Sequence, residues 1–157
     1  MVDFKEYYEE YKFYSANTSK DLKQLKSNVM NIVERKQLVS VMNDTKWLKL
    51  QFEINKNLAF PPAFISKYIT DKIEPDTLDF EKQIPRYYGN WLNYYEEGLP
   101  PLYNIEWLEV YPKFEKHQGQ LIQGQVIDAS EEFEAILYKL NIPFDKKNGI
   151  YKIWGYK

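Results

Sequence analysis

The chain has 157 residues, no cysteine and a formal net charge of −2. This length suits a single domain. The missing cysteine excludes disulfides, thiolate catalysis and cysteine-ligated zinc, and the lack of a basic excess is atypical of a general nucleic-acid-binding protein. Residues 61–157 carry 11 basic and 15 acidic residues, which indicates an acidic surface on this part of the chain.

The first 40 residues predict two helices. Residues 3–14 place aromatic side chains at helical spacing, and residues from Lys20 to about Val41 carry an apolar stripe of period near 3.6. We expect residues 1–40 to form an N-terminal helical extension of an α+β domain that spans residues 41–157.

The middle of the chain predicts one more helix and one strand. The Asn43-Asp44-Thr45 cluster supplies helix-capping side chains, and Phe60-Pro61-Pro62 ends the helix because proline cannot continue it. Residues 63–69 alternate as a strand does, and residues 71–81 form an acidic loop. Residues 86–95 are rich in aromatics and predict either a strand or a short helix.

The last third of the chain is the easiest to interpret. It predicts a capped helix over 130–140, started by Asp128 or Ser130, and an Asn148-Gly149 turn. Gly155 inside a strand predicts a bulge or a close backbone approach. The strands expected here cover 105–111, 121–127 (a strand or an extended arm) and 149–156. The chain therefore predicts an α+β fold, with an antiparallel sheet of about four strands packed against the helices that begin near Thr45 and Ser130.

The residues that could carry chemistry do not form a recognisable catalytic pattern. His117, the one histidine, lies in an expected loop after a strand. Glu106 and Glu109 are three apart on a predicted strand, so they should point to opposite faces and form no acid–base pair. The six glycines are scattered, without a phosphate-binding loop. We expect a protein that is not an enzyme and has no metal or cofactor.

The aromatic residues around position 90 are the best candidates for a binding surface. Tyrosines next to glutamates suit a basic protein partner, because the carboxylates complement its charge and the rings supply contact area. We expect charge reversal at Glu96 and Glu97 to weaken binding of this partner. The candidate partner-binding residues are Tyr87, Tyr88, Trp91, Tyr94, Tyr95, Glu96 and Glu97, although Trp91 is equally compatible with a place in the core.

Two alternative functions stay open at this point. His117 could work with Glu106 or Glu109 in a small-molecule-binding or hydrolytic domain. The N-terminal helix pair could instead dimerise a structural or regulatory subunit, and the oligomeric state is left open. The charged N-terminus lacks a signal-peptide core, and no stretch reaches the roughly 18 apolar residues of a membrane span. We therefore expect a cytoplasmic protein that binds neither membranes nor nucleic acid.

Three stretches together resemble a known family. They are Val41 to Trp47, Ile105 to Leu108, and Ile142 through Phe144 with Ile153 to Tyr156. They resemble small, uncharacterised bacterial proteins that form a domain of unknown function, over about residues 42–156. Proteins of this kind often look like immunity or accessory proteins near toxin genes. The resemblance implies a toxin-neutralising or enzyme-neutralising partner protein, and it carries over no catalytic residue.

Overall fold

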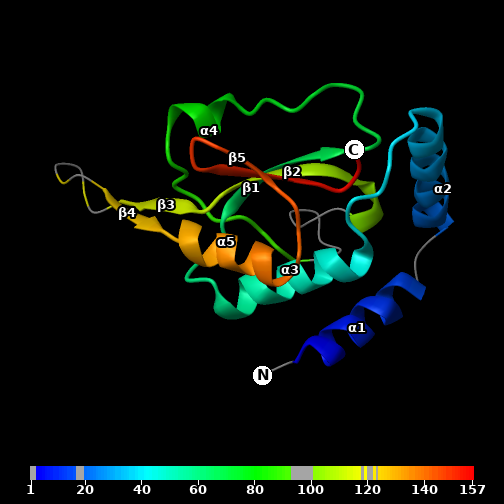
Figure 1. Cartoon of the computed structure of the whole chain (residues 1–157), viewed down its shortest axis with the longest axis horizontal. Helices are drawn as coiled ribbons and strands as arrows, with labels where there is room; N and C mark the ends of the chain where they lie inside the picture. The colour runs from blue at the N-terminus through cyan, green and yellow to red at the C-terminus, as the bar shows by residue number, and fades with distance from the viewer. Residues whose placement is uncertain (1–2, 17–19, 93–100, 118, 120–121, 123) are drawn as a thin grey trace.

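The computed structural model describes residues 3–16, 20–92, 101–117, 119, 122 and 124–157 (Figure 1). The fold is α+β, as the sequence predicts. The elements in these ranges, in chain order, are α1 (Phe4–Ala16), α2 (Lys20–Arg35), α3 (Asp44–Asn57), β1 (Ala63–Tyr68), α4 (Leu78–Lys82), η1 (Leu102–Asn104), β2 (Ile105–Tyr111), β3 (Lys113–Lys116), β4 (Gln125–Asp128), α5 (Ser130–Lys139), β5 (Asp145–Lys147) and β6 (Ile150–Trp154).

The main sheet has four strands in the order β1-β2-β6-β5, and every pair is antiparallel. The predicted number of strands in this sheet is confirmed, but the four strands are not all the ones expected. The region of the expected 121–127 strand supplies β4, which pairs with β3 in a separate ribbon that projects from the body (Figure 1). Pro112 lies between β2 and β3 and has no N–H to donate, which fits a change of sheet at that point.

The short strand β5 takes the fourth place in the sheet because a tight turn joins it to β6. Asn148 and Gly149 both have positive φ, 53° and 79°. Two positive φ angles in succession are the signature of a type I′ hairpin turn, which the Asn-Gly pair favours. The predicted turn is therefore confirmed, and it fixes the register of β5 on β6.

One face of the sheet, here called the inner face, is covered by α3 and α5 (Figure 1). Leu108 and Val110 of β2 and Ile153 of β6 are completely buried on this side. Phe133 of α5 packs edge-to-face on Tyr151 of β6, with ring centroids 5.3 Å apart. This layer contains most of the hydrophobic core.

The two covering helices begin in different ways, and α3 alone has a side-chain cap. The Oδ1 atom of Asn43 accepts the Lys46 N–H at 2.8 Å and so starts α3, which confirms the predicted cap cluster. The N-cap residue of α5 is Ala129, which has no side-chain acceptor, so neither predicted candidate, Asp128 or Ser130, is the cap itself. The Oδ1 atom of Asp128 accepts the Ser130 N–H at 2.9 Å from one position before the cap.

The aromatic side of α1 packs against α3. The Tyr7 hydroxyl donates to Gln51 Oε1 at 2.9 Å, and the Tyr11 hydroxyl donates to Asp44 Oδ2 at 2.7 Å. Tyr11 belongs to the main core cluster, and Phe4 and Tyr7 pack against it. The side of the first helix that carries these three rings is therefore used within its own chain.

The helix α2 is shorter than predicted, ending at Arg35 instead of near Val41. Gln37 has a φ of 55°, and the Leu38 N–H bonds the Val33 carbonyl at 3.0 Å, which closes the helix with a Schellman-type ending. Val29 is fully buried against Ile69 and Tyr156. How the chain divides at residue 40 stays a prediction, but both N-terminal helices pack on the part after it.

Two further regions differ from the prediction. The expected acidic loop over 71–81 contains the five-residue helix α4, too short to leave a periodic signal. Residues 86–92 form neither the strand nor the helix expected there. They are held by single contacts instead, such as the Gly89 N–H to the Pro61 carbonyl at 3.1 Å.

Gly155 marks a close approach of three segments, as its place in a strand predicts. The N–H groups of Gly155 and Tyr156 both bond the Glu106 carbonyl, and the Gly155 carbonyl accepts the N–H groups of Val41 and Met42. A Cβ atom at position 155 would collide with the Ile105 carbonyl oxygen.

In the described ranges, no helix has the length and apolar character needed to cross a membrane.

Candidate functional site

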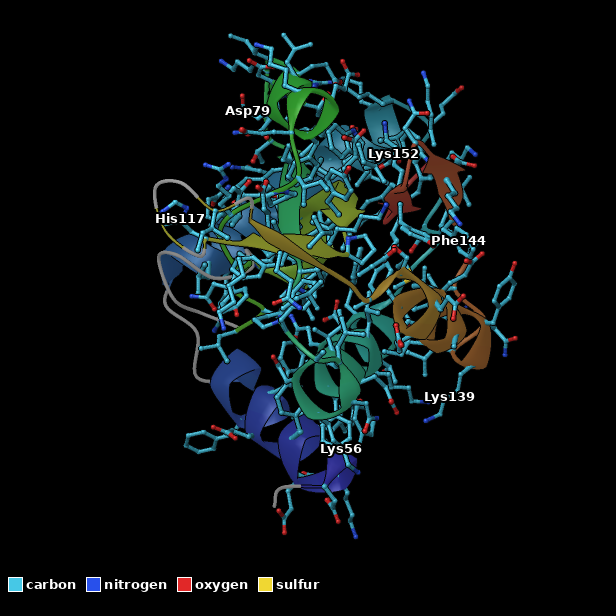
Figure 2. All side chains as sticks on the ribbon, turned by 90° about the vertical axis from the view of Figure 1, so that its left-hand side faces the viewer. Lys56, Asp79, His117, Lys139, Phe144 and Lys152 are labelled. Atoms are coloured by element: carbon cyan, nitrogen blue, oxygen red, sulfur yellow. The ribbon has the colours of Figure 1, made fainter. Side chains whose placement is uncertain are left out.

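The second face of the sheet, here called the outer face, is only partly covered. Phe80 of α4 packs on Ala63 of β1 and Tyr111 of β2. Figure 2 shows Asp79 of α4 and Lys152 of β6 on one side of the sheet, with Lys56 and Lys139 on the other. Alternation along the strands gives this face charged and tryptophan side chains.

A cleft opens on this face between α4 and the β5–β6 hairpin. We call it the outer cleft. Its volume is about 550 Å³, which lies within the range of ligand-binding pockets. Phe80 and Tyr111 contact edge-to-face with centroids 5.5 Å apart and form an apolar wall with Ile150. The residues that line the cleft are Thr77, Phe80, Glu81, Glu109, Tyr111, Asp145, Lys147, Asn148 and Ile150.

Glu109 is the half-buried carboxylate of the outer cleft. Burial raises its pKa, the negative charge of Glu81 raises it further, and the positive charge of Lys152 partly opposes both effects. Within the described ranges, its carboxylate makes no hydrogen bond and no ion pair within 4 Å. The cleft therefore contains a carboxylate that no neighbouring group neutralises by direct contact.

Lys152 is the cross-strand partner of Glu109, but its charge lies over two rings. Its Nζ atom is 4.3 Å from the centroid of Trp107 and 4.4 Å from that of Trp154. The Trp154 Nε1–H donates to Asp145 Oδ2 at 3.0 Å, which fixes the ring. Cation–π attraction thus holds the lysine over the tryptophans.

The outer face also carries a buried ion pair, between Lys67 of β1 and Glu106 of β2. Pairing of β1 with β2 skips Glu106, since Lys67 pairs with Trp107 and Tyr68 with Ile105. This bulge interrupts the strict alternation expected between Glu106 and Glu109. It brings the Glu106 carboxylate 2.7 Å from Lys67 Nζ, with side-chain exposures of 12% and 6%. Glu106 is therefore already engaged.

The structure does not bring His117 together with either glutamate. His117 is exposed just after β3, as the loop prediction had it. In Figure 2 it lies far across the view from Lys152, whose strand partner is Glu109. Across the described residues, no group of three or more histidine, aspartate or glutamate side chains is arranged to hold a metal ion.

Of the predicted binding residues that the structure describes, Tyr87 and Tyr88 are exposed and Trp91 is buried. Tyr87 and Tyr88 are each 55% exposed. Trp91 is 1% exposed, donates its Nε1–H to the Pro62 carbonyl at 2.8 Å and packs edge-to-face on Phe64. Its assignment to a binding surface was wrong, because this bond and contact hold it in the core. Tyr94, Tyr95, Glu96 and Glu97 lie outside the described residues.

The exposed tyrosines differ in their surroundings. Tyr88 contacts the rings of Phe60 and Phe114, with centroids 6.0 Å and 4.6 Å away. For Tyr87, burial raises the pKa of the hydroxyl and the charge of Asp79 adds to the effect. Tyr87 therefore lies near α4, whose Glu81 lines the outer cleft.

Sequence reasoning missed the outer cleft. Glu81 and Asp145 are separated by more than 60 positions and belong to a short helix and a three-residue strand. The available signal was the alternation that places Glu109 beside Trp107 and Lys152 beside Trp154. That signal becomes a site only when the register of β2 on β6 is known.

Fold and cleft together define a small α+β protein with a partly open, charged sheet face. A family model matches residues 29–157, and the chain belongs to this family, a family of unknown function (DUF6678). The match begins inside α2, earlier than the resemblance over 42–156. Neither a search of curated proteins nor a search of solved structures found a match.

Proposed function

We propose that this chain is a non-enzymatic, immunity-like or inhibitor-like protein that neutralises a basic toxin or enzyme by occluding it. In this proposal it acts in the bacterial cytoplasm. The observation that carries the proposal is the gathering of carboxylates around α4 and the outer cleft. These carboxylates are Asp79, Glu81, Glu109 and Asp145, against Lys147 as the basic residue of the cleft lining.

Such a surface fits a basic protein better than it fits other ligands. Carboxylates complement a cationic surface and speed the encounter, and aromatic side chains supply contact area at low entropic cost. Tyr87 offers a half-exposed ring next to Asp79. An acidic rim with an aromatic neighbour would complement a cationic substrate groove in charge and contact area, which supports occlusion as the mechanism.

The test is affinity capture from the native cells with three versions of the tagged chain. The first is wild type, the second reverses α4 (Asp79→Lys/Glu81→Lys), and the control reverses α5 (Glu131→Lys/Glu132→Lys). Both pairs lie in the first turn of a helix, so both changes place lysines near a helix N-terminus. Only the α4 pair lies on the outer face.

We expect wild type and control to retain one basic protein in roughly equimolar amount, and the α4 variant to lose it because like charges then face each other. The purified partner should lose activity when the wild-type chain is added. Equal retention by all three versions, or no equimolar protein with wild type, would contradict the proposal.

A further inference from the structure

We propose that the outer cleft receives one basic side chain, lysine or arginine, projecting from the protein partner, and that Glu109 takes its charge. This inference rests on the proposed function and assigns its central contact. It is carried by the combination of an apolar wall and an uncommitted carboxylate in one cavity of about 550 Å³.

The wall of the cleft suits the stem of a basic side chain. Lysine and arginine carry three or four methylene groups that pack on apolar surface while the charged head reaches a polar group. The edges of the contacting Phe80 and Tyr111 rings line the cleft together with the partly exposed Ile150. A small inorganic cation would leave this wall unused.

Glu109 suits the charged head of such a side chain. It is half-buried, and within the described part of the chain it has neither a hydrogen bond nor a close ion pair. Lys152, the cross-strand partner whose charge lowers the pKa of Glu109, is held over Trp107 and Trp154. A cation from outside would therefore meet a partly desolvated carboxylate, where charge-assisted hydrogen bonds are strong.

The rim of the cleft selects against acidic side chains. Glu81 and Asp145 are exposed there, and Lys147 is the basic residue of the lining. An anion that entered would face three carboxylates, and its burial would lack a partner for most of its charge. The lining thus distinguishes side chains by the sign of their charge as well as by the length of their stem.

The cleft can be tested on the full-length chain by NMR titration with blocked tripeptides of glycine, a central residue and glycine. The central residue is lysine, arginine, glutamate or norleucine, the last being an uncharged side chain of similar length. We expect the lysine and arginine peptides to shift the backbone amide signals of Glu109, Tyr111 and Asn148. The glutamate and norleucine peptides should leave these signals in place.

Two variants locate the charge. Glu109→Gln keeps the shape and removes the charge, so the lysine peptide should bind at least about tenfold more weakly, the usual effect of losing a bond to a charged group. Glu132→Gln on α5 removes an exposed carboxylate of the inner-face layer and should leave the affinity unchanged. Thermal unfolding of both variants establishes that each is folded.

Three results would overturn the inference: equal affinity of Glu109→Gln and wild type for the lysine peptide, equal shifts with the norleucine peptide, or binding of n-butylamine without binding of the lysine peptide. The last would make the cleft a site for free amines. Each result leaves the capture experiment untouched, so the failure of this contact can be told apart from the failure of partner binding.

Discussion

The inner and outer faces of the sheet come from alternate residues of the same strands and have opposite chemistry. Leu108, Val110 and Ile153 point inward and are completely buried under α3 and α5. Glu109 and Lys152 point outward and face a cleft or a pair of tryptophan rings. Burial of one face is therefore enough to set the register of the strands, and this leaves the other face free to carry charge.

The outer face also has buried residues, among them Trp107 and the Lys67–Glu106 ion pair, whose two side chains are 6% and 12% exposed. A buried ion pair adds little net stability, since desolvation offsets attraction, yet breaking it is costly. Variants of the inner core, of this ion pair and of the surface charges can separate what each face contributes to stability.

The largest expected effect is on the inner face. Phe133→Ala should lower the free energy of unfolding by about 3–5 kcal/mol, because it empties a fully buried site against Tyr151. Tyr138→Ala on the same helix, at a 67% exposed site, should change it by about 0.5 kcal/mol or less. Urea unfolding followed by circular dichroism measures both. Equal losses would mean that α5 is not held by its inner side.

The buried pair of the outer face comes next. Lys67→Met should cost about 3 kcal/mol, the lower end for a broken buried pair, because Glu106 keeps some exposure to water. The double variant Lys67→Met/Glu106→Leu should recover most of this loss, since the remaining partner, Glu74, has a side chain that is 71% exposed to water. Urea unfolding of the single and double variants decides. A double variant as unstable as the single one would show that packing, rather than charge, makes Lys67 necessary.

The start of α3 gives an intermediate effect. Asn43→Ala removes the oxygen that accepts the Lys46 N–H and should cost about 1 kcal/mol. Asn43→Asp keeps an acceptor and adds a charge that the helix dipole favours, so it should match wild type or exceed it. Melting temperatures of the two variants provide the measurement, and an unaffected Asn43→Ala protein would show that water replaces the cap.

The sequence predicted the elements whose signals are local. A cap within Asn43-Asp44-Thr45, a hairpin turn at Asn148-Gly149 and a bulge or close approach at Gly155 all follow from backbone chemistry within a few residues. The end of α2 was misplaced because the apolar stripe continues past Arg35, while the left-handed conformation of Gln37 depends on the segment that follows.

The site was harder to predict than the fold because it depends on pairing. Trp91 sits among tyrosines in the sequence, and only its bond to the Pro62 carbonyl shows that it belongs to the core. The outer cleft depends on a three-residue strand and a five-residue helix, both too short for any periodic signal. Glu109 was named from sequence, but its neighbour Lys152 follows from the register of β2 on β6, and its neighbour Glu81 follows from the placement of α4.

Surface charge on the inner-face helices should have a small, pH-dependent effect. A hydrogen bond from Lys139 lowers the pKa of Glu53 below its ordinary 4.5, against the effect of burial. The pair therefore stabilises the fold above pH 4.5, and this contribution is lost as the pH falls through the lowered pKa. Glu53→Gln should cost less than about 1 kcal/mol at pH 7. A loss that is independent of pH between 7 and 3 would contradict this assignment.

The outer face should show the opposite sign at Glu109. Its pKa is raised above 4.5 by burial, so the ionised carboxylate opposes folding, and stability falls as the pH rises through the raised pKa. Glu109→Gln should thus stabilise the protein at pH 7, by about 0.5 kcal/mol or less, and this gain should vanish below pH 4.5, where both folded and unfolded chains carry the proton. Urea unfolding at pH 7 and pH 4 measures the change. A stabilised variant would show that the ionised carboxylate opposes folding, as a group kept for recognition can, whereas lower stability of the variant would place Glu109 among the residues that hold the fold.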